Sequence, residues 1–228
     1  MNILVIDIGG NSVKMHATGW KEPRRFSSGP DLTPRQMVAD AKKVAAGFKY
    51  DAVSIGYPGV VTNNRITVDP NNLGPGWVGF NFKTAFRCPV KLINDAAMQA
   101  MGSYRKGTML FLGLGTGLGT ALVADGHVLP MELGALNYLE GTYEDYVGHR
   151  GLIKYGKAKW RTHVARVVKE LAAALCANDV ALGGGNIANL QKLPPLCRAG
   201  SNDHAFVGGF RLWDGEKPKS ATPRKKKA

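Results

Sequence analysis

Apolar runs and glycine turns alternate along this chain of 228 residues. An apolar strand, a glycine-rich turn and a second apolar strand follow one another over residues 108–123, and residues 3–17 repeat the pattern. This pattern predicts a β-hairpin, because glycine accepts φ values and close backbone approaches that a side chain forbids. Two such hairpins, each opening a series of strands and helices, predict a duplicated α/β fold with a cleft between two lobes.

The remaining pattern predicts further elements around the hairpins. Three strands are expected over residues 1–29, and Thr33 and Pro34 are typical of a helix N-terminus, with the helix reaching Gly47. Further strands are expected at 51–57, 65–68, 89–93, 127–129 and 180–182, and further helices at 96–104, 142–147, 157–178 and 202–213. The longest helix carries an apolar stripe that predicts core packing. The long aromatic loop 71–82 is expected to be functional.

Composition limits the class of protein. A hydrophobic content of 44% is enough to bury a sizeable core. No apolar run reaches membrane length, so no membrane partner is expected. Asp7 interrupts the first apolar run, and that run is therefore predicted to be a strand rather than a signal peptide. Cys88, Cys176 and Cys197 are scattered without a CxxC pair, so reduced thiols of a cytoplasmic protein are expected.

The formal net charge of +13 invites a nucleic-acid interpretation. Residues 215–228 hold six Lys or Arg and one Glu, hence +5, and predict a disordered basic tail; the body keeps the other +8. Cations gather in one segment of the body: Arg150, Lys154, Lys157, Lys159, Arg161 and Arg166. They form either the solvated face of the long helix or a track for a polyanionic small substrate.

The two glycine turns offer backbone N–H groups and hydroxyls suited to phosphate oxygens. Neither matches G-x-G-x-x-G, since Leu118 and Thr120 interrupt the second one, and the absence of Gly-Lys-Ser/Thr excludes a Walker A loop. Glycines also mark simple tight turns. Asp7 at the end of the first strand and Lys14 just past its turn favour the phosphate interpretation, although Lys14 is equally well explained as a surface lysine.

Polar residues follow two other predicted strands. Asn94 and Asp95 come at the carboxyl end of strand 89–93, where open α/β sheets collect ligands. Asp95 is therefore a candidate general base, and its simpler explanation is an N-cap of helix 96–104. Gly183, Gly184 and Gly185 follow strand 180–182 and open a further predicted helix, a geometry that presents N–H groups to a ligand.

Taken together, these residues resemble the ROK family of sugar kinases, within the actin-like ATPase superfamily and its ribonuclease H-like fold. Residues 7–14 are similar to the first phosphate motif of that family, and residues 115–120 to the second. Residues 72–77 look like its sugar loop, 94–96 like its catalytic Asn-Asp-Ala, and 183–186 like its adenosine-side glycine motif. The short length and the run from Gly119 to Gly134 most resemble the polyphosphate glucokinases.

The resemblance implies transfer of a phosphoryl group from polyphosphate or ATP to a hexose hydroxyl, with the 6-OH of glucose favoured. Asp95 would be the catalytic base, and Asp7 would anchor Mg²⁺ through water. The implied substrate-binding residues are Asn72, Asn94, Asp95, Glu132 and Glu144. The implied phosphate- or nucleotide-binding residues are Asp7, Gly9, Gly10, Asn11, Lys14, Gly115, Thr116, Gly117, Gly183, Gly184 and Gly185.

One segment departs from the zinc-containing members of that family. Ala135 stands where those members have a histidine, and residues 137–141 form a short bridge in place of their cysteine cluster. No structural zinc is therefore expected. The family's sugar contact from histidine is lost as well, which leaves the hexose open.

The expected organisation is a lobe 1–94, a lobe 95–214 and the tail 215–228, assembled as a homodimer. Two other classes stay open. One is a non-catalytic sugar or nucleotide sensor with a nucleic-acid-binding basic surface, and the other is an actin-like ATPase with a protein partner. Asp95 argues against the sensor, which needs no base, and the sugar loop argues against the ATPase. A hexose is accordingly the expected partner, rather than nucleic acid.

Overall fold

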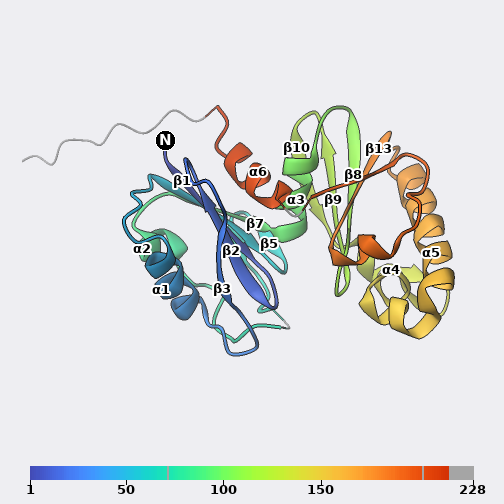
Figure 1. Cartoon of the computed structure of the whole chain (residues 1–228), viewed down its shortest axis with the longest axis horizontal. Helices are drawn as coiled ribbons and strands as arrows, with labels where there is room; N and C mark the ends of the chain where they lie inside the picture. Colours follow the sequence, from blue (N-terminus) through green and yellow to red (C-terminus); the bar gives the residue numbers. More distant parts are fainter. Residues whose placement is uncertain (71, 202, 216–228) are drawn as a thin grey trace, which may run out of the picture.

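The computed structural model describes residues 1–70, 72–201 and 203–215. Most of its strands form two five-stranded sheets, one in each half of the molecule (Figure 1), and the shortest strands form two separate two-stranded sheets. The first five-stranded sheet consists of β1 (Ile3–Ile8), β2 (Ser12–Ala17), β3 (Arg24–Ser27), β4 (Ala52–Tyr57) and β7 (Val90–Asn94), in the order β3-β2-β1-β4-β7. The second consists of β8 (Thr108–Leu114), β9 (Leu118–Ala124), β10 (His127–Met131), β13 (Asp179–Gly183) and β14 (Cys197–Ala199), in the order β10-β9-β8-β13-β14. A predicted glycine hairpin opens each sheet.

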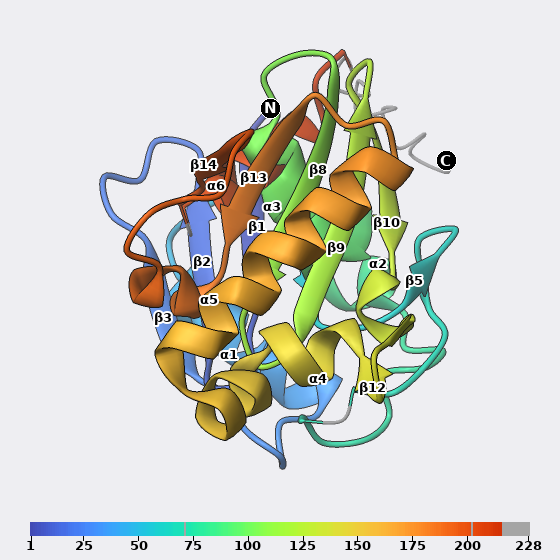
Figure 2. The same cartoon turned by 90° about the vertical axis from the view of Figure 1, so that its right-hand side faces the viewer.

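The helices cover both faces of the sheets. They are α1 (Pro34–Val44), α2 (Phe82–Phe86), α3 (Asp95–Ser103), α4 (Tyr143–Val147), α5 (His149–Ala174) and α6 (His204–Arg211). Met37, Phe82 and other apolar residues of α1 and α2 pack on the outer face of the first sheet. Trp160 and Val164 of α5 pack on the second sheet, across which α5 runs diagonally (Figure 2). Because both faces are covered, β1 and β4 are buried throughout.

Helices α3 and α6 lie between the two sheets (Figure 1). Ala97 and Ala100 of α3 pack with the second sheet, and Met98 of the same helix packs with Val5 of the first. The two helices touch through glycine, since a Cβ on Gly208 would overlap the carbonyl oxygen of Met98. Helix α3 is thereby held against both halves of the molecule.

Most predicted elements are present where the sequence places them. The two hairpins form with the expected pairing, β1 with β2 and β8 with β9. Thr33 is the N-cap of α1, with Pro34 at its first position. Its hydroxyl accepts from the backbone N–H of Gln36, and the Gln36 side chain accepts from the N–H of Thr33, which completes a capping box.

Several boundaries differ from the prediction. The longest helix begins at His149 rather than 157, is broken at Gly156 (φ +69°), and ends at Ala174. The glycines at 183–185 open a five-residue 3₁₀ helix (Gly185–Asn189) instead of an α-helix. Five short elements were not predicted: helix α2 and the strands β5 (Val61–Thr62), β11 (Asn137–Tyr138), β12 (Gly141–Thr142) and β14. The strand expected at 65–68 is present but has only two residues, β6 (Arg65–Ile66). Elements this short carry too little periodicity to be recognised in a sequence.

Three expectations stay outside these findings. The tail predicted at 215–228 lies, apart from Gly215, beyond the described residues, as does Asn202, the expected start of the last helix. The division into lobes 1–94 and 95–214 stays a prediction. Among the residues that the structure describes, no helix is long and apolar enough to span a membrane.

Candidate active site

The carboxyl ends of three parallel strands meet at one edge of the first sheet. Asp7 of β1 lies opposite Gly56 of β4, and Tyr57 of β4 lies opposite Asn94, the last residue of β7. Gly56 makes room for the Met98 side chain, which a Cβ there would overlap, and the same Cβ would lie in ordinary contact with Oδ1 of Asp7 (3.5 Å). Asp95 follows at the first position of α3. The strand-end prediction therefore brings Asp7 and Asp95 to one place.

Asn94, not Asp95, caps helix α3. Oδ1 of Asn94 accepts from the backbone N–H of Ala97 (3.1 Å), and its Nδ2 donates to the carbonyl of Gly59 (3.1 Å). Asp95 instead accepts from the adjacent N–H of Ala96 (2.7 Å). The alternative explanation of Asp95 as a mere N-cap is therefore wrong. Asn94 is buried and already bonded at both ends of its amide, and its contact with a hexose stays a prediction.

Burial favours the neutral form of both aspartates, and repulsion by neighbouring carboxylates adds to the effect at Asp95. Burial raises the pKa of Asp7 to about 6, with the charge of Lys14 opposing part of the rise. Burial raises the pKa of Asp95 to about 7; the charges of Asp7 and Glu132 add to this rise, and the N–H of Ala96 opposes it. A carboxylate that titrates near neutral pH, in hydrogen-bonding reach of a substrate hydroxyl, has the properties of a general base.

Two glutamates approach from the second half of the molecule. Glu132 precedes a 3₁₀ turn (Leu133–Ala135), and Glu144 lies in the first turn of α4. Oε2 of Glu144 rests against Gly117, where a Cβ would overlap it. Burial and then the charge of Glu144 raise the pKa of Glu132. Since Glu132 in turn affects Asp95, the four predicted acidic residues belong to one electrostatic cluster.

The tips of the two glycine hairpins are shaped by local hydrogen bonds. The N–H of Gly9 donates to the carbonyl of Ser12 (3.0 Å), and the N–H of Gly115 donates to those of Gly113 (3.1 Å) and Gly117 (3.2 Å). These two donors are therefore already used within the turns. Asn11 and Thr116 are exposed at the two tips.

The sugar loop and the third glycine segment each touch a hairpin. Nδ2 of Asn72 rests against Gly10, where a Cβ would overlap it. Asn186, just past the segment 183–185, donates from Nδ2 to the carbonyl of Gly115 (2.9 Å). Gly184 has φ +84° and lies against the backbone of Leu114. The predicted phosphate-binding segments 115–117 and 183–185 thus lie side by side.

Asp69 organises the predicted sugar loop, and the sequence analysis did not identify it. Its Oδ1 accepts from the N–H groups of Trp77 (2.8 Å) and Val78 (3.1 Å). These bonds, led by that from Val78, hold the pKa of Asp69 below its usual value. The acceptor and its donors are eight and nine positions apart. Short sequence motifs do not span this distance, so the sequence did not indicate the role of Asp69.

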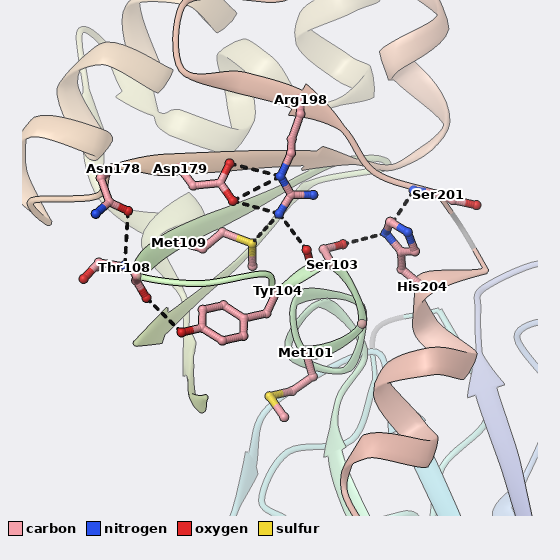
Figure 3. A network of polar contacts seen from close by, with 12 residues as sticks. Met101, Ser103, Tyr104, Thr108, Met109, Asn178, Asp179, Arg198, Ser201 and His204 are labelled. Atoms are coloured by element: carbon pink, nitrogen blue, oxygen red, sulfur yellow. Dashed lines mark hydrogen bonds and ion pairs between the residues drawn. The ribbon is translucent and has the colours of Figure 1, made fainter. Parts of the chain in front are cut away.

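Two arginines fix the far end of the helix that carries Asp95; Figure 3 shows Arg198 between Asp179 and Ser103. Arg198 binds Asp179 through two nitrogens (Nε–Oδ1 3.0 Å, Nη2–Oδ2 2.8 Å) and donates to the carbonyl of Ser103 (2.6 Å). Arg211 donates to the carbonyls of Met101 (2.7 Å) and Tyr104 (3.0 Å). Guanidinium groups at the carboxyl end of a helix satisfy its free carbonyls and complement its dipole. Neither arginine was predicted.

Aromatic packing occupies the segment where zinc-containing relatives would have cysteines. Tyr138 of β11 stacks on Tyr143 at a centroid distance of 5.0 Å, and its hydroxyl lies 3.1 Å from Nδ1 of His163. Tyr146 meets Tyr138 edge-on, also at 5.0 Å. The described residues contain no group of three or more His, Cys, Asp or Glu that could hold a metal ion.

We expect the purified protein to contain no stoichiometric zinc, because the aromatic cluster has no thiolate and Ala135 has no imidazole. Elemental analysis of protein dialysed without chelator measures this directly. Tightly held zinc at one ion per chain would contradict the prediction.

Comparison with known proteins first defines the class of fold. The two halves match solved structures with the actin-like ATPase fold. A polyphosphate/ATP-glucomannokinase from Arthrobacter sp. strain KM superimposes with a TM-score of 0.76 at 22% identity, covering 91% of this chain and 96% of that one. A ROK family glucokinase from Streptomyces griseus, solved with glucose and AMPPNP, gives a TM-score of 0.71 at 17% identity, covering 93% and 99%. The predicted fold class is confirmed.

The sequence comparison then gives the family. The ROK family model matches residues 4–134, and the chain belongs to the ROK family. A polyphosphate glucokinase from Mycobacterium leprae is 26% identical over 213 residues, which cover 84% of this chain and 65% of that protein. Its counterpart from Mycobacterium tuberculosis is 24% identical, with 84% and 80% covered. The chain thus spans slightly less than two thirds of the Mycobacterium leprae relative.

Proposed function

We propose that this protein is a hexose kinase, which transfers a phosphoryl group from polyphosphate or ATP to a hexose hydroxyl, with the 6-OH of glucose as the favoured acceptor. The observation that carries the proposal is Asp95. It lies at a strand end beside a second acid, it has no capping role, and its pKa is raised to about 7. The names of the relatives, glucokinases and polyphosphate glucokinases, support the choice of substrates.

In this mechanism the chain positions both reactants. Asp95 accepts the proton of the attacking hydroxyl, and the glycine hairpins bind the donor phosphates. The other hydroxyls of the hexose are bound by Asn72, Asn94, Glu132 and Glu144, because a buried polyol needs a partner for each polar group. Phosphoryl transfer depends on such positioning and on neutralising charge, more than on covalent chemistry.

Asp7 is the residue that would anchor a magnesium ion. Mg²⁺ keeps several waters in proteins and binds through one or two carboxylates together with substrate phosphates. Asp7 meets that description, since it is a buried carboxylate next to a second one and no all-protein cage is needed. Asp7 would hold the ion through water. When bound, Mg²⁺ supplies positive charge to the donor phosphates.

The pH dependence of catalysis follows from Asp95. Only its ionised form accepts a proton, so kcat/KM should fall as the pH decreases through about 7, the raised pKa of this group in the free protein. Initial rates with saturating Mg²⁺, measured between about pH 5.5 and 8.5, test this. A profile that stays flat down to about pH 5, the range of an ordinary aspartate, would contradict it.

A substrate panel tests the function itself. Glucose, mannose and N-acetylated hexosamines are each assayed with ATP and with polyphosphate, and formation of the sugar phosphate is measured. The proposal expects glucose to be phosphorylated, with polyphosphate giving more turnover than ATP. Absence of sugar phosphate with every pair, together with salt-sensitive DNA binding, would instead establish the non-catalytic sensor.

A further inference from the structure

A row of charged side chains crosses the first sheet beside the candidate site. Asp7 of β1 pairs with Lys14 of β2, and Lys14 pairs with Arg25 of β3. Residues directly opposite each other in antiparallel strands point to the same face, with Cβ atoms about 5 Å apart. The row therefore runs from the acid cluster through Lys14 to Arg25 at the outer edge of the sheet.

A second polar row lies next to the first, closer to the glycine turn. Ser12 pairs with Ser27, and alternate residues of a strand share a face, so both hydroxyls lie on the face of Lys14 and Arg25. The carbonyl of Ser12 also accepts from the N–H of Gly9. Two cations and two hydroxyls thus border the turn expected to bind phosphate.

The two neighbouring arginines of β3 differ in their surroundings. Arg24 points to the opposite face, where its Nη1 donates to the carbonyl of Val44 (2.6 Å) and its guanidinium lies 4.0 Å from the Trp20 ring centroid. Arg25 is exposed, and its side chain makes no hydrogen bond or ion pair with any other described residue. The fold accounts for Arg24, whereas Arg25 is available to a ligand.

The basic segment on α5 is less available than its composition suggests. Arg161 donates to the carbonyl of Asn189 (2.6 Å), and Arg166 pairs with Glu170 (2.8 Å). Lys154 and Lys159 lie 5.1 and 5.2 Å from the Tyr155 ring centroid. Four of the six cations predicted as a track therefore have partners within the chain.

We propose that Lys14, Arg25, Ser12 and Ser27, together named the β2–β3 strip, bind linear polyphosphate beyond the phosphates held at the glycine turns. The inference rests on the proposed function, because it extends the donor site of that reaction. A long bound polyanion would extend from the site across β2 and β3, since side-chain exposure increases from Lys14 to Arg25. ATP ends in a nucleoside and has no phosphates to place there.

The test is the affinity of the full chain for fluorescently labelled long-chain polyphosphate, measured by anisotropy without hexose at several salt concentrations. Arg25→Glu should weaken binding about tenfold or more at low salt. Arg25→Gln should reduce the slope of log affinity against log salt by about 0.7–0.9, the contribution of one phosphate contact. The matched control is Arg35→Glu, an equal charge change at an exposed position of α1. It should have little effect.

Kinetics separate this inference from the proposed function. Where hexose is phosphorylated, Arg25→Glu should raise the KM for long-chain polyphosphate about tenfold more than the KM for ATP. Equal effects of Arg25→Glu and Arg35→Glu on polyphosphate binding would refute the proposed binding at the β2–β3 strip. Arg25 would then be explained as a charge that keeps an edge strand from pairing with other chains. Loss of binding in Lys157→Glu but not in Arg25→Glu would overturn the proposal in favour of α5. Selective loss in Arg25→Glu without any hexose phosphorylation would support the strip and refute the kinase.

Discussion

We expect Asp95→Asn to lower the kcat of hexose phosphorylation by about 10²–10⁴-fold, the usual contribution of a general base. The amide keeps the shape of the carboxylate and can still accept the N–H of Ala96, but it cannot take the proton of the sugar hydroxyl. Hexose affinity should therefore change little. Asn94 continues to cap α3 in the variant, so the effect is expected in kcat and not in the fold.

Stability and a surface control separate catalysis from folding. Because the folded-state pKa of Asp95 is raised to about 7, its ionisation destabilises the fold as the pH rises from the ordinary value of 3.8 through about 7. At pH 8 the asparagine variant should accordingly be at least as stable as the wild type. Asp40→Asn, at a surface pair with Lys43, should keep full activity. Near-wild-type turnover of Asp95→Asn would show that Asp95 is not the base.

Gly208→Ala lowers the thermal midpoint by about 6–12 °C, which corresponds to about 3 kcal/mol in a chain of this size. A Cβ at this position would overlap the carbonyl oxygen of Met98 and would lie 2.9 Å from the backbone nitrogen of Gly102. Both obstacles are backbone atoms of α3, which cannot turn away as a side chain can. The helices must separate, and α3 would lose its contact with the first sheet.

Thermal unfolding followed by circular dichroism measures this loss. Val207→Ala is the matched control, since it changes the adjacent, exposed residue of the same helix and should shift the midpoint by no more than about 2 °C. A similarly small shift in Gly208→Ala would contradict the close crossing of α3 and α6. Gly208→Ala should also lower activity at temperatures where the variant is folded, because a displaced α3 would displace Asp95.

What the sequence could predict was local. The glycine hairpins and the Thr33 cap follow from a few adjacent residues, and both are present as expected. Asp95 could be found for the same reason, as a polar residue at the end of an apolar run. The choice between cap and base could not be made from the sequence, because either Asn94 or Asp95 satisfies the preference for an N-cap.

What the sequence could not predict depends on distant contacts. Arg198 and Arg211 bind carbonyls of α3 that lie 95 to 110 positions away in the chain. Glycine is required at position 208 because the carbonyl of Met98, far away in the sequence, lies against it, and no sequence pattern indicates this contact. The helical pattern of residues continues through Gly156, but the backbone of this one residue is not helical and breaks α5. In each case tertiary packing decides, and local preference is too weak to reveal it.

We infer that the Asp95 site transfers a phosphoryl group to a hexose. ³¹P NMR of the wild-type protein with glucose, Mg²⁺ and either polyphosphate or ATP tests it most directly, with Asp95→Asn followed in parallel. We expect a growing hexose phosphate signal for the wild type, and a rate at least about a hundredfold lower for the variant. No hexose phosphate from either donor, or equal rates for the two proteins, would contradict it.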